Sequence, residues 1–142
     1  MKVESTEDGF RIFVQNNYFN KIDWDDKEKI SEQVKNVFFM IKKNYHISIK
    51  GLYRVKVYPN KLGVLIIAIK LDNESYGSSE FDLRIIVLFD KEIYLKFDDC
   101  YLLDKLPYFY KDGYFVNLED VNNIFEIIEF CILVTSDEIG VY

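Results

Sequence analysis

Apolar and polar residues alternate with a period of two along several short segments, a pattern typical of half-buried β-strands. The alternation runs through residues 10–14, 53–57, 81–89 and 93–97. Residues 64–71 are almost continuously apolar, which predicts a central strand covered on both faces. Gly9 and Gly63 lie in turn segments between the strands, so we expect a hairpin over residues 1–14 and a second turn over 59–63.

Two segments carry a helical period instead. The stronger one repeats apolar residues at the spacing i, i+3, i+4, i+7 and predicts a helix over residues 26–45, with Asp25 as its N-cap and Glu28 completing a capping box. A second helix is expected after a cap at Glu119 or Asp120. Its predicted buried face consists of Val121, Ile124, Phe125, Ile128, Cys131 and Ile132. For residues 137–142 we expect a short strand or an ordered tail.

The order of these elements predicts an α+β fold, with antiparallel sheets built from hairpins and two packed helices. A length of 142 residues fits a single domain over 1–142. Residues 72–80 are the one linker-like stretch. They leave open whether the chain forms one body or two lobes, 1–71 and 81–142, joined by this loop.

The clearest hairpin signal lies between Tyr108 and Leu118, where two aromatic segments flank Lys111-Asp112-Gly113. Alternation divides the side chains into two sets that face opposite sides. The first set is Tyr108, Tyr110, Tyr114 and Val116, and the second is Phe109 and Phe115. We expect one set to enter the core and the other to form a protein-contact surface, unless the chain's own helices cover both faces.

Composition limits the classes of binding partner that the chain suits. Aromatic residues make up 17% of the chain and suit protein contacts, whereas the formal charge of −6 disfavours direct binding of nucleic acid or of an anionic membrane. Only Lys105 and Lys111 lie near the aromatic hairpin, so a platform for stacking single-stranded nucleic acid is disfavoured as well. The chain has no apolar run of membrane-spanning length and no signal-peptide pattern, which predicts a cytoplasmic location.

Catalytic and metal-binding motifs are missing from the sequence. One histidine, His46, and two distant cysteines, Cys100 and Cys131, do not make a zinc site, and we expect both thiols to be reduced and buried. No phosphate-binding glycine loop is present. Carboxylates gather at residues 23–28, 98–104 and 119–120, where helix caps and loops explain them better than Mg²⁺ binding or acid–base catalysis does. We therefore predict no enzyme activity, no cofactor and no metal.

The layout resembles that of MecA-type adaptor proteins. The segments behind the resemblance are Lys2–Glu4, Phe10–Val14, Ser31–Phe38, Gly51–Val55, Lys61–Ile67 and Tyr110–Val116. The family usually joins its domains by a long acidic linker, whereas residues 72–80 are short, and residues 92–107 have no counterpart. The resemblance implies a non-enzymatic adaptor that hands client proteins to a Clp-type AAA+ unfoldase, and it transfers no functional residue.

Two functions follow as expectations. The first is a protein-binding adaptor or regulator that acts through the aromatic surface. The alternative is a small acidic inhibitor, such as an immunity or anti-defence protein, of a toxin or nuclease. In both cases the partner is another protein, and a homodimer through an exposed strand edge is a further expectation.

Overall fold

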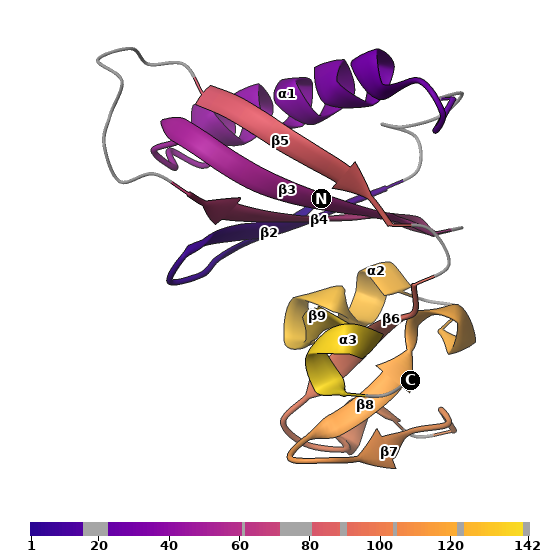
Figure 1. The fold of residues 1–142 in the computed structure, drawn as a ribbon. Helices are drawn as coiled ribbons and strands as arrows, with labels where there is room; N and C mark the ends of the chain where they lie inside the picture. The colour runs from indigo at the N-terminus through magenta and orange to yellow at the C-terminus, as the bar shows by residue number, and fades with distance from the viewer. Residues whose placement is uncertain are drawn as a thin grey trace. The chain divides into compact units, whose positions relative to one another are not determined.

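The structure is a computed structural model that describes residues 1–15, 23–60, 62–71, 81–88, 91–103, 105–121 and 124–140. Its fold is α+β, as the sequence predicted. The residues divide into two compact units, Met1 with Val3–Phe89 and Lys2 with Asp90–Tyr142. Each unit has its own sheet (Figure 1).

The N-terminal unit consists of a five-stranded sheet and one long helix. Its elements are β1 (Lys2–Ser5), β2 (Gly9–Gln15), α1 (Lys27–Asn44), β3 (Gly51–Pro59), β4 (Gly63–Lys70) and β5 (Phe81–Val87). The strand order is β1-β2-β4-β3-β5, and Figure 1 shows α1 along one face of this sheet. β4 pairs antiparallel with β2 and with β3, whereas β5 pairs parallel with β3. The sheet is therefore mixed, which differs from the expected antiparallel arrangement.

Packing of α1 on the sheet forms the core of this unit. Ile30, Val34, Phe38 and Ile41 follow the predicted helical spacing and are almost completely buried. The Phe38 ring meets the Phe10 ring edge-on, with centroids 4.9 Å apart, so the helix is held against β2 by an aromatic pair as well as by aliphatic contacts. The predicted first helix and its buried face are confirmed.

Both ends of α1 carry side chains suited to capping a helix, but the predicted N-cap residue is wrong by one position. The N-cap is Asp26 rather than Asp25, because the Asp26 carboxylate accepts a hydrogen bond from the Lys29 N–H at 3.3 Å. At the other end Lys42 and Lys43 complement the negative helix terminus, and His46 takes a positive φ of 54° just beyond the C-cap.

The continuously apolar segment is a central strand, as predicted. β4 lies between β2 and β3, and Gly63 to Ala68 are all buried. Position 63 requires a glycine because the backbone of β2 passes close to it. An added Cβ would lie 2.5 Å from the Val14 carbonyl oxygen.

The C-terminal unit consists of a four-stranded sheet with short helical turns. Its elements are β6 (Ile93–Phe97), η2 (Tyr101–Leu103), β7 (Phe109–Tyr110), β8 (Tyr114–Asn117), η3 (Leu118–Asp120), α2 (Ile124–Ile127), η4 (Ile128–Phe130), β9 (Ile132–Thr135) and α3 (Ser136–Ile139). The strand order is β7-β8-β6-β9, and the three pairings are antiparallel. The predicted hairpin over 108–118 is confirmed.

The second predicted helix is wrong in its extent. Only one turn, α2, is α-helical, and the chain then passes through η4 into β9, which pairs with β6. Cys131 is buried as expected, but Ile132, predicted to be buried, is exposed on β9. Glu119 and Asp120, the expected caps, lie inside the 3-10 turn η3, whose own N-cap is Asn117: its side chain accepts a hydrogen bond from the Glu119 N–H at 3.0 Å. Residues 122–123, directly before α2, lie outside the described residues. The strand expected within residues 137–142 is also wrong as far as the described residues extend, since Asp137 to Ile139 belong to the helical turn α3. Residues 141–142 lie outside the described residues.

The boundary between the units lies later than the expected loop. Residues 72–80 are outside the described residues, but β5, which follows them, pairs with β3 along seven residue pairs. Backbone pairing of this length places Phe81–Val87 in the N-terminal unit, not in a lobe 81–142. The chain passes from one unit to the other at Phe89 and Asp90.

Replacing Val34 with aspartate tests the α1–sheet core. Val34 has no exposed surface, so the variant buries an unpaired charge and should lose several kcal/mol of stability, enough to unfold a domain of ordinary stability. Circular dichroism during urea unfolding measures this loss. Asn36→Asp, on the exposed side of the same helix, is the control and should unfold like the wild type. Near-normal stability of Val34→Asp would show that this face of α1 is not a core face.

Candidate functional site

The turn of the β7–β8 hairpin is closed by local backbone chemistry. The Lys111 N–H donates to the Gly113 carbonyl at 2.9 Å, and Asp112 and Gly113 adopt positive φ angles of 55° and 152°. Asp and Gly are the residue types that tolerate such angles. The Lys111 ammonium also donates to the Ile139 carbonyl at 2.9 Å, which fastens the turn to the end of α3.

The two phenylalanines of the hairpin lie on its inner face. Phe109 and Phe115 are cross-strand partners, and their rings stack with centroids 5.3 Å apart. Tyr94 on β6 meets Phe109 edge-on at 5.6 Å. Phe115 and Tyr94 are buried together with Val134, so this side of the hairpin belongs to the core of the unit.

The tyrosines of the hairpin lie on its outer face. The Tyr114 ring is flanked by two others, with centroids 5.5 Å from Tyr108 and 5.1 Å from Tyr110. Tyr108 and Tyr110 remain 49% and 67% exposed, and Tyr114 is half-buried between them. We call these three residues the tyrosine surface. The edge-on contacts hold the rings in a fixed arrangement, which limits the entropy lost when a partner binds.

Val116, the fourth residue expected on this face, lies in a different environment. It shares the outer direction of β8 with Tyr114 but is completely buried. Its side chain is a core residue and is left out of the tyrosine surface. The alternation between the two sets thus holds along the hairpin, but the outer set is exposed only near the turn.

Cys100 lies beside the tyrosine surface. Electrostatic interaction with Cys100 is the main reason that the pKa of Tyr114 is raised, with partial burial and the neighbouring Tyr108 and Tyr110 adding to it. Cys100 is exposed, contrary to the expectation that both thiols are buried, whereas Cys131 is buried and its thiol donates to the Ile128 carbonyl at 3.5 Å. Both cysteines are free.

Negative charge is concentrated in the unit that carries the tyrosine surface. Residues 90–142 contain 12 acidic residues and four lysines, a formal charge of −8, whereas residues 1–89 contain 14 basic and 12 acidic residues, a charge of +2. The described carboxylates of the C-terminal unit are all exposed. Two of its lysines are engaged internally, Lys91 with Asp137 at 3.6 Å and Lys111 with a carbonyl of α3. The excess negative charge of the chain is therefore carried by residues 90–142.

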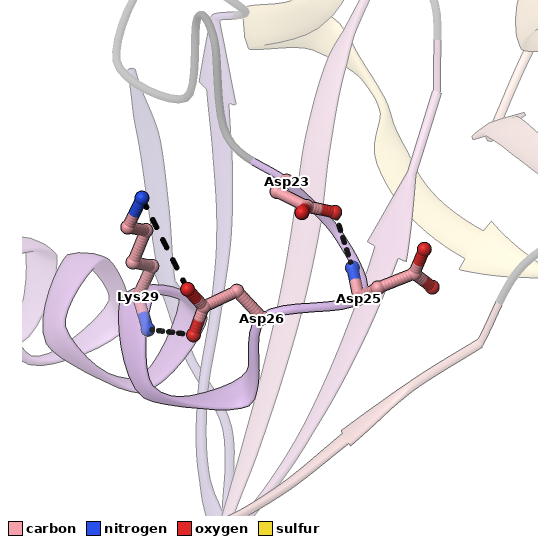
Figure 2. A network of polar contacts seen from close by, with 4 residues as sticks. All are labelled: Asp23, Asp25, Asp26 and Lys29. Atoms are coloured by element: carbon pink, nitrogen blue, oxygen red, sulfur yellow. Dashed lines mark hydrogen bonds and ion pairs between the residues drawn. The ribbon is translucent and has the colours of Figure 1, made fainter.

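The acidic cluster before α1 is explained by the start of the helix. Figure 2 shows the Asp23 carboxylate accepting from the Asp25 N–H at 3.0 Å, and Asp26 meeting both the N–H and the ammonium group of Lys29. Within the described ranges, no three or more His, Cys, Asp or Glu side chains lie close enough together to hold a metal ion. Asp104, from a second cluster, lies outside the described residues.

A pocket of about 330 Å³ lies where the start of α1 meets β5. Its lining residues are Trp24, Asp25, Lys27, Ile30, Ile85, Ile86 and Val87. Its walls are mostly apolar, and a single carboxylate and a single ammonium group do not form a recognisable catalytic pair. The pocket belongs entirely to the N-terminal unit and is separate from the tyrosine surface.

Sequence reasoning missed several exposed apolar side chains in the C-terminal unit. Tyr101, on η2 directly after Cys100, is 87% exposed, and Phe130 is largely exposed on η4. Tyr101 follows the loop residues Asp98 and Asp99, and this polar context could have indicated exposure. Phe130 had no such signal, because the apolar run around it also fits a buried helix.

The chain matches no protein-family model, no curated protein and no solved structure. The resemblance to MecA-type adaptors therefore stays a prediction. Among the helices of the described residues, none is both long and apolar enough to cross a membrane.

The two thiols should react at very different rates in native buffer. Cys100 is exposed and should react rapidly with a thiol reagent such as DTNB, whereas Cys131 should react only slowly until urea is added. Titration of Cys100→Ser should remove the rapid phase and leave the slow one. Rapid labelling of both thiols in the native protein would contradict the buried position of Cys131.

Tyr94 should make stability depend on alkaline pH. Burial and a hydrogen bond donated to Glu92 raise the pKa of Tyr94 from 10.0 to about 12. Between these values the folded state keeps a proton that the unfolded state releases, so the free energy of unfolding falls as the pH rises. We expect a smaller fall in Tyr94→Phe when urea unfolding is measured across this pH range. Tyr108→Phe is the control, and equal falls in Tyr94→Phe and the wild type would contradict the assignment.

Proposed function

We propose that this protein is a non-enzymatic, protein-binding adaptor or regulator, and that the tyrosine surface is its contact site. The observation behind the proposal is the contiguous arrangement of Tyr108, Tyr110 and Tyr114 on the solvent side of a hairpin whose other side is packed. None of these three tyrosine rings is fully buried in the core of the unit. It leaves apolar area in water, and a partner protein would remove that area from water.

Tyrosine suits this role for two physical reasons. Its ring offers a large contact area with few rotatable bonds, and its hydroxyl can hydrogen-bond to a partner or to water at the rim of an interface. Residues of this type contribute a large share of the energy in many interfaces when they lie in a central cluster. The hairpin supplies such a cluster on a strand pair, anchored by Phe109 and Phe115 beneath it.

The charge distribution favours one alternative within the same class of function. A formal charge of −8 on residues 90–142 suits an inhibitor that covers a basic site, such as the nucleic-acid-binding site of a toxin or nuclease. The two alternatives differ in what happens to the partner. An inhibitor abolishes the activity of the protein it binds, whereas an adaptor leaves that protein active and delivers it elsewhere.

The experiment is a capture from native lysate followed by binding measurements with the purified partner. We expect Tyr110→Ser with Tyr108→Ser to weaken binding at least tenfold, because both rings are exposed and their loss removes central contact area. Binding measured at increasing salt should also weaken, since the acidic surface contributes electrostatic attraction. An activity assay of the captured partner then separates inhibitor from adaptor.

Tyr45→Ser is the matched control. Tyr45 is 45% exposed, but it lies at the end of α1 in the N-terminal unit, so its replacement should leave partner binding unchanged. Circular dichroism should show that each variant keeps its fold. Unchanged affinity of the Tyr108/Tyr110 variant, with an intact fold, would place the contact site elsewhere.

A further inference from the structure

Among the described residues, no strand pairs with the outer edge of β5, the last strand of the N-terminal sheet. β5 stands at the end of the order β1-β2-β4-β3-β5, and within the described part of the chain it pairs with β3 alone. With seven residues it is longer than β1, the strand at the opposite edge, which has four. Figure 1 shows β5 running along the border of the sheet beneath α1.

The direction of the backbone groups of β5 follows from its pairing with β3. The Leu88 N–H donates to the Val57 carbonyl at 2.8 Å. Successive residues of a strand direct their backbone groups to alternate sides, so residues of even number point their N–H and C=O groups towards β3. Leu83, Ile85 and Val87 therefore direct theirs towards the open edge, where they can pair with another strand.

Part of the usual protection against pairing is absent from the described strand. The described strand contains no proline, and its side chains above the sheet, Leu83, Ile85 and Val87, pack against the core while remaining partly exposed. Ile86, on the other face, is 55% exposed. A regular edge strand of seven residues, most of them apolar, is a template for an added strand.

The charges on the strand indicate which strand is added. Asp82 and Arg84 are both exposed on the face away from α1 and lie on either side of Leu83. If two copies of β5 pair antiparallel about a two-fold axis at Leu83, Asp82 of each copy lies opposite Arg84 of the other. These are non-hydrogen-bonded positions, where cross-strand side chains are closest, because Leu83 itself takes the hydrogen-bonded position.

Neighbouring registers lose this complementarity. A two-fold axis at Arg84 would set the two Arg84 side chains against each other, and an axis at Ile85 would place Arg84 opposite Ile86. We propose that this protein forms a symmetric homodimer in which the β5 strands of two copies pair antiparallel about Leu83. The two five-stranded sheets become one continuous sheet with both copies of α1 on the same face. This interface lies in the N-terminal unit and is independent of the proposed contact role of the tyrosine surface.

Charge reversal tests the interface and its register together. Sedimentation velocity of the full chain should show a dimer whose population rises with protein concentration. Asp82→Arg alone, or Arg84→Asp alone, places like charges in two symmetric positions and should raise the dimer dissociation constant roughly tenfold. The double variant Asp82→Arg/Arg84→Asp restores opposite charges and should dimerise like the wild type. An equimolar mixture of the two single variants should form a heterodimer more tightly than either forms a homodimer.

Glu32→Arg is the matched control, because Glu32 is exposed on α1 and the change in charge is the same as in Asp82→Arg. It should leave the dissociation constant unchanged. A wild-type protein that stays monomeric at every concentration would overturn the proposal. So would a dimer indifferent to both single reversals, or a mixture of the two variants without preference for the heterodimer.

Discussion

The pairing register of β7 with β8 decides which aromatic side chains this protein exposes. Phe109 lies opposite Phe115 and Tyr110 opposite Tyr114, so every phenylalanine of the hairpin faces Tyr94 while the tyrosines face away from it. A slip of one residue would exchange the two faces and expose the phenylalanines. The turn at Asp112 and Gly113, with its positive φ angles, and the bond from Lys111 to the end of α3 hold the register in place.

The proposed contact role rests on the same constraint, combined with the charge of the unit. The two phenylalanine rings anchor the hairpin on one side, and the tyrosines form a cluster on its other side, in a unit whose residues 90–142 carry a formal charge of −8. A partner with a basic, partly apolar surface would satisfy both features, through long-range attraction and through burial of the rings. The N-terminal unit, which does not include Lys2, carries a charge of only +1, and its β5 edge offers a separate site for self-association.

Elements with a strong local pattern could be predicted from the sequence. Residue periodicity and turn residues predict α1, the hairpins and the central strand β4. The same alternation predicts that the tyrosines and phenylalanines of the β7–β8 hairpin face opposite sides. Pairings between distant segments could not be predicted. The parallel contact of β5 with β3 follows from the three-dimensional arrangement, since nothing in Phe81–Val87 distinguishes a parallel from an antiparallel neighbour. The spacing of apolar residues from Val121 to Ile132 predicts one continuous helix, but only Ile124–Ile127 is α-helical, and Ile132–Thr135 pairs with β6 as a strand. The burial of Val116 could not be predicted either, because alternation gives the direction of a side chain but not what covers it.

Hydrogen–deuterium exchange of the complex with a captured partner tests the central claim most directly. The amides of Tyr108 to Tyr114 are expected to exchange more slowly in the complex than in the free protein, because a partner seated on the tyrosine surface shields this hairpin. The peptides of β2 and β4, in the N-terminal sheet, should keep their exchange rates. Protection confined to the N-terminal unit, with unchanged exchange across the β7–β8 hairpin, would contradict the account.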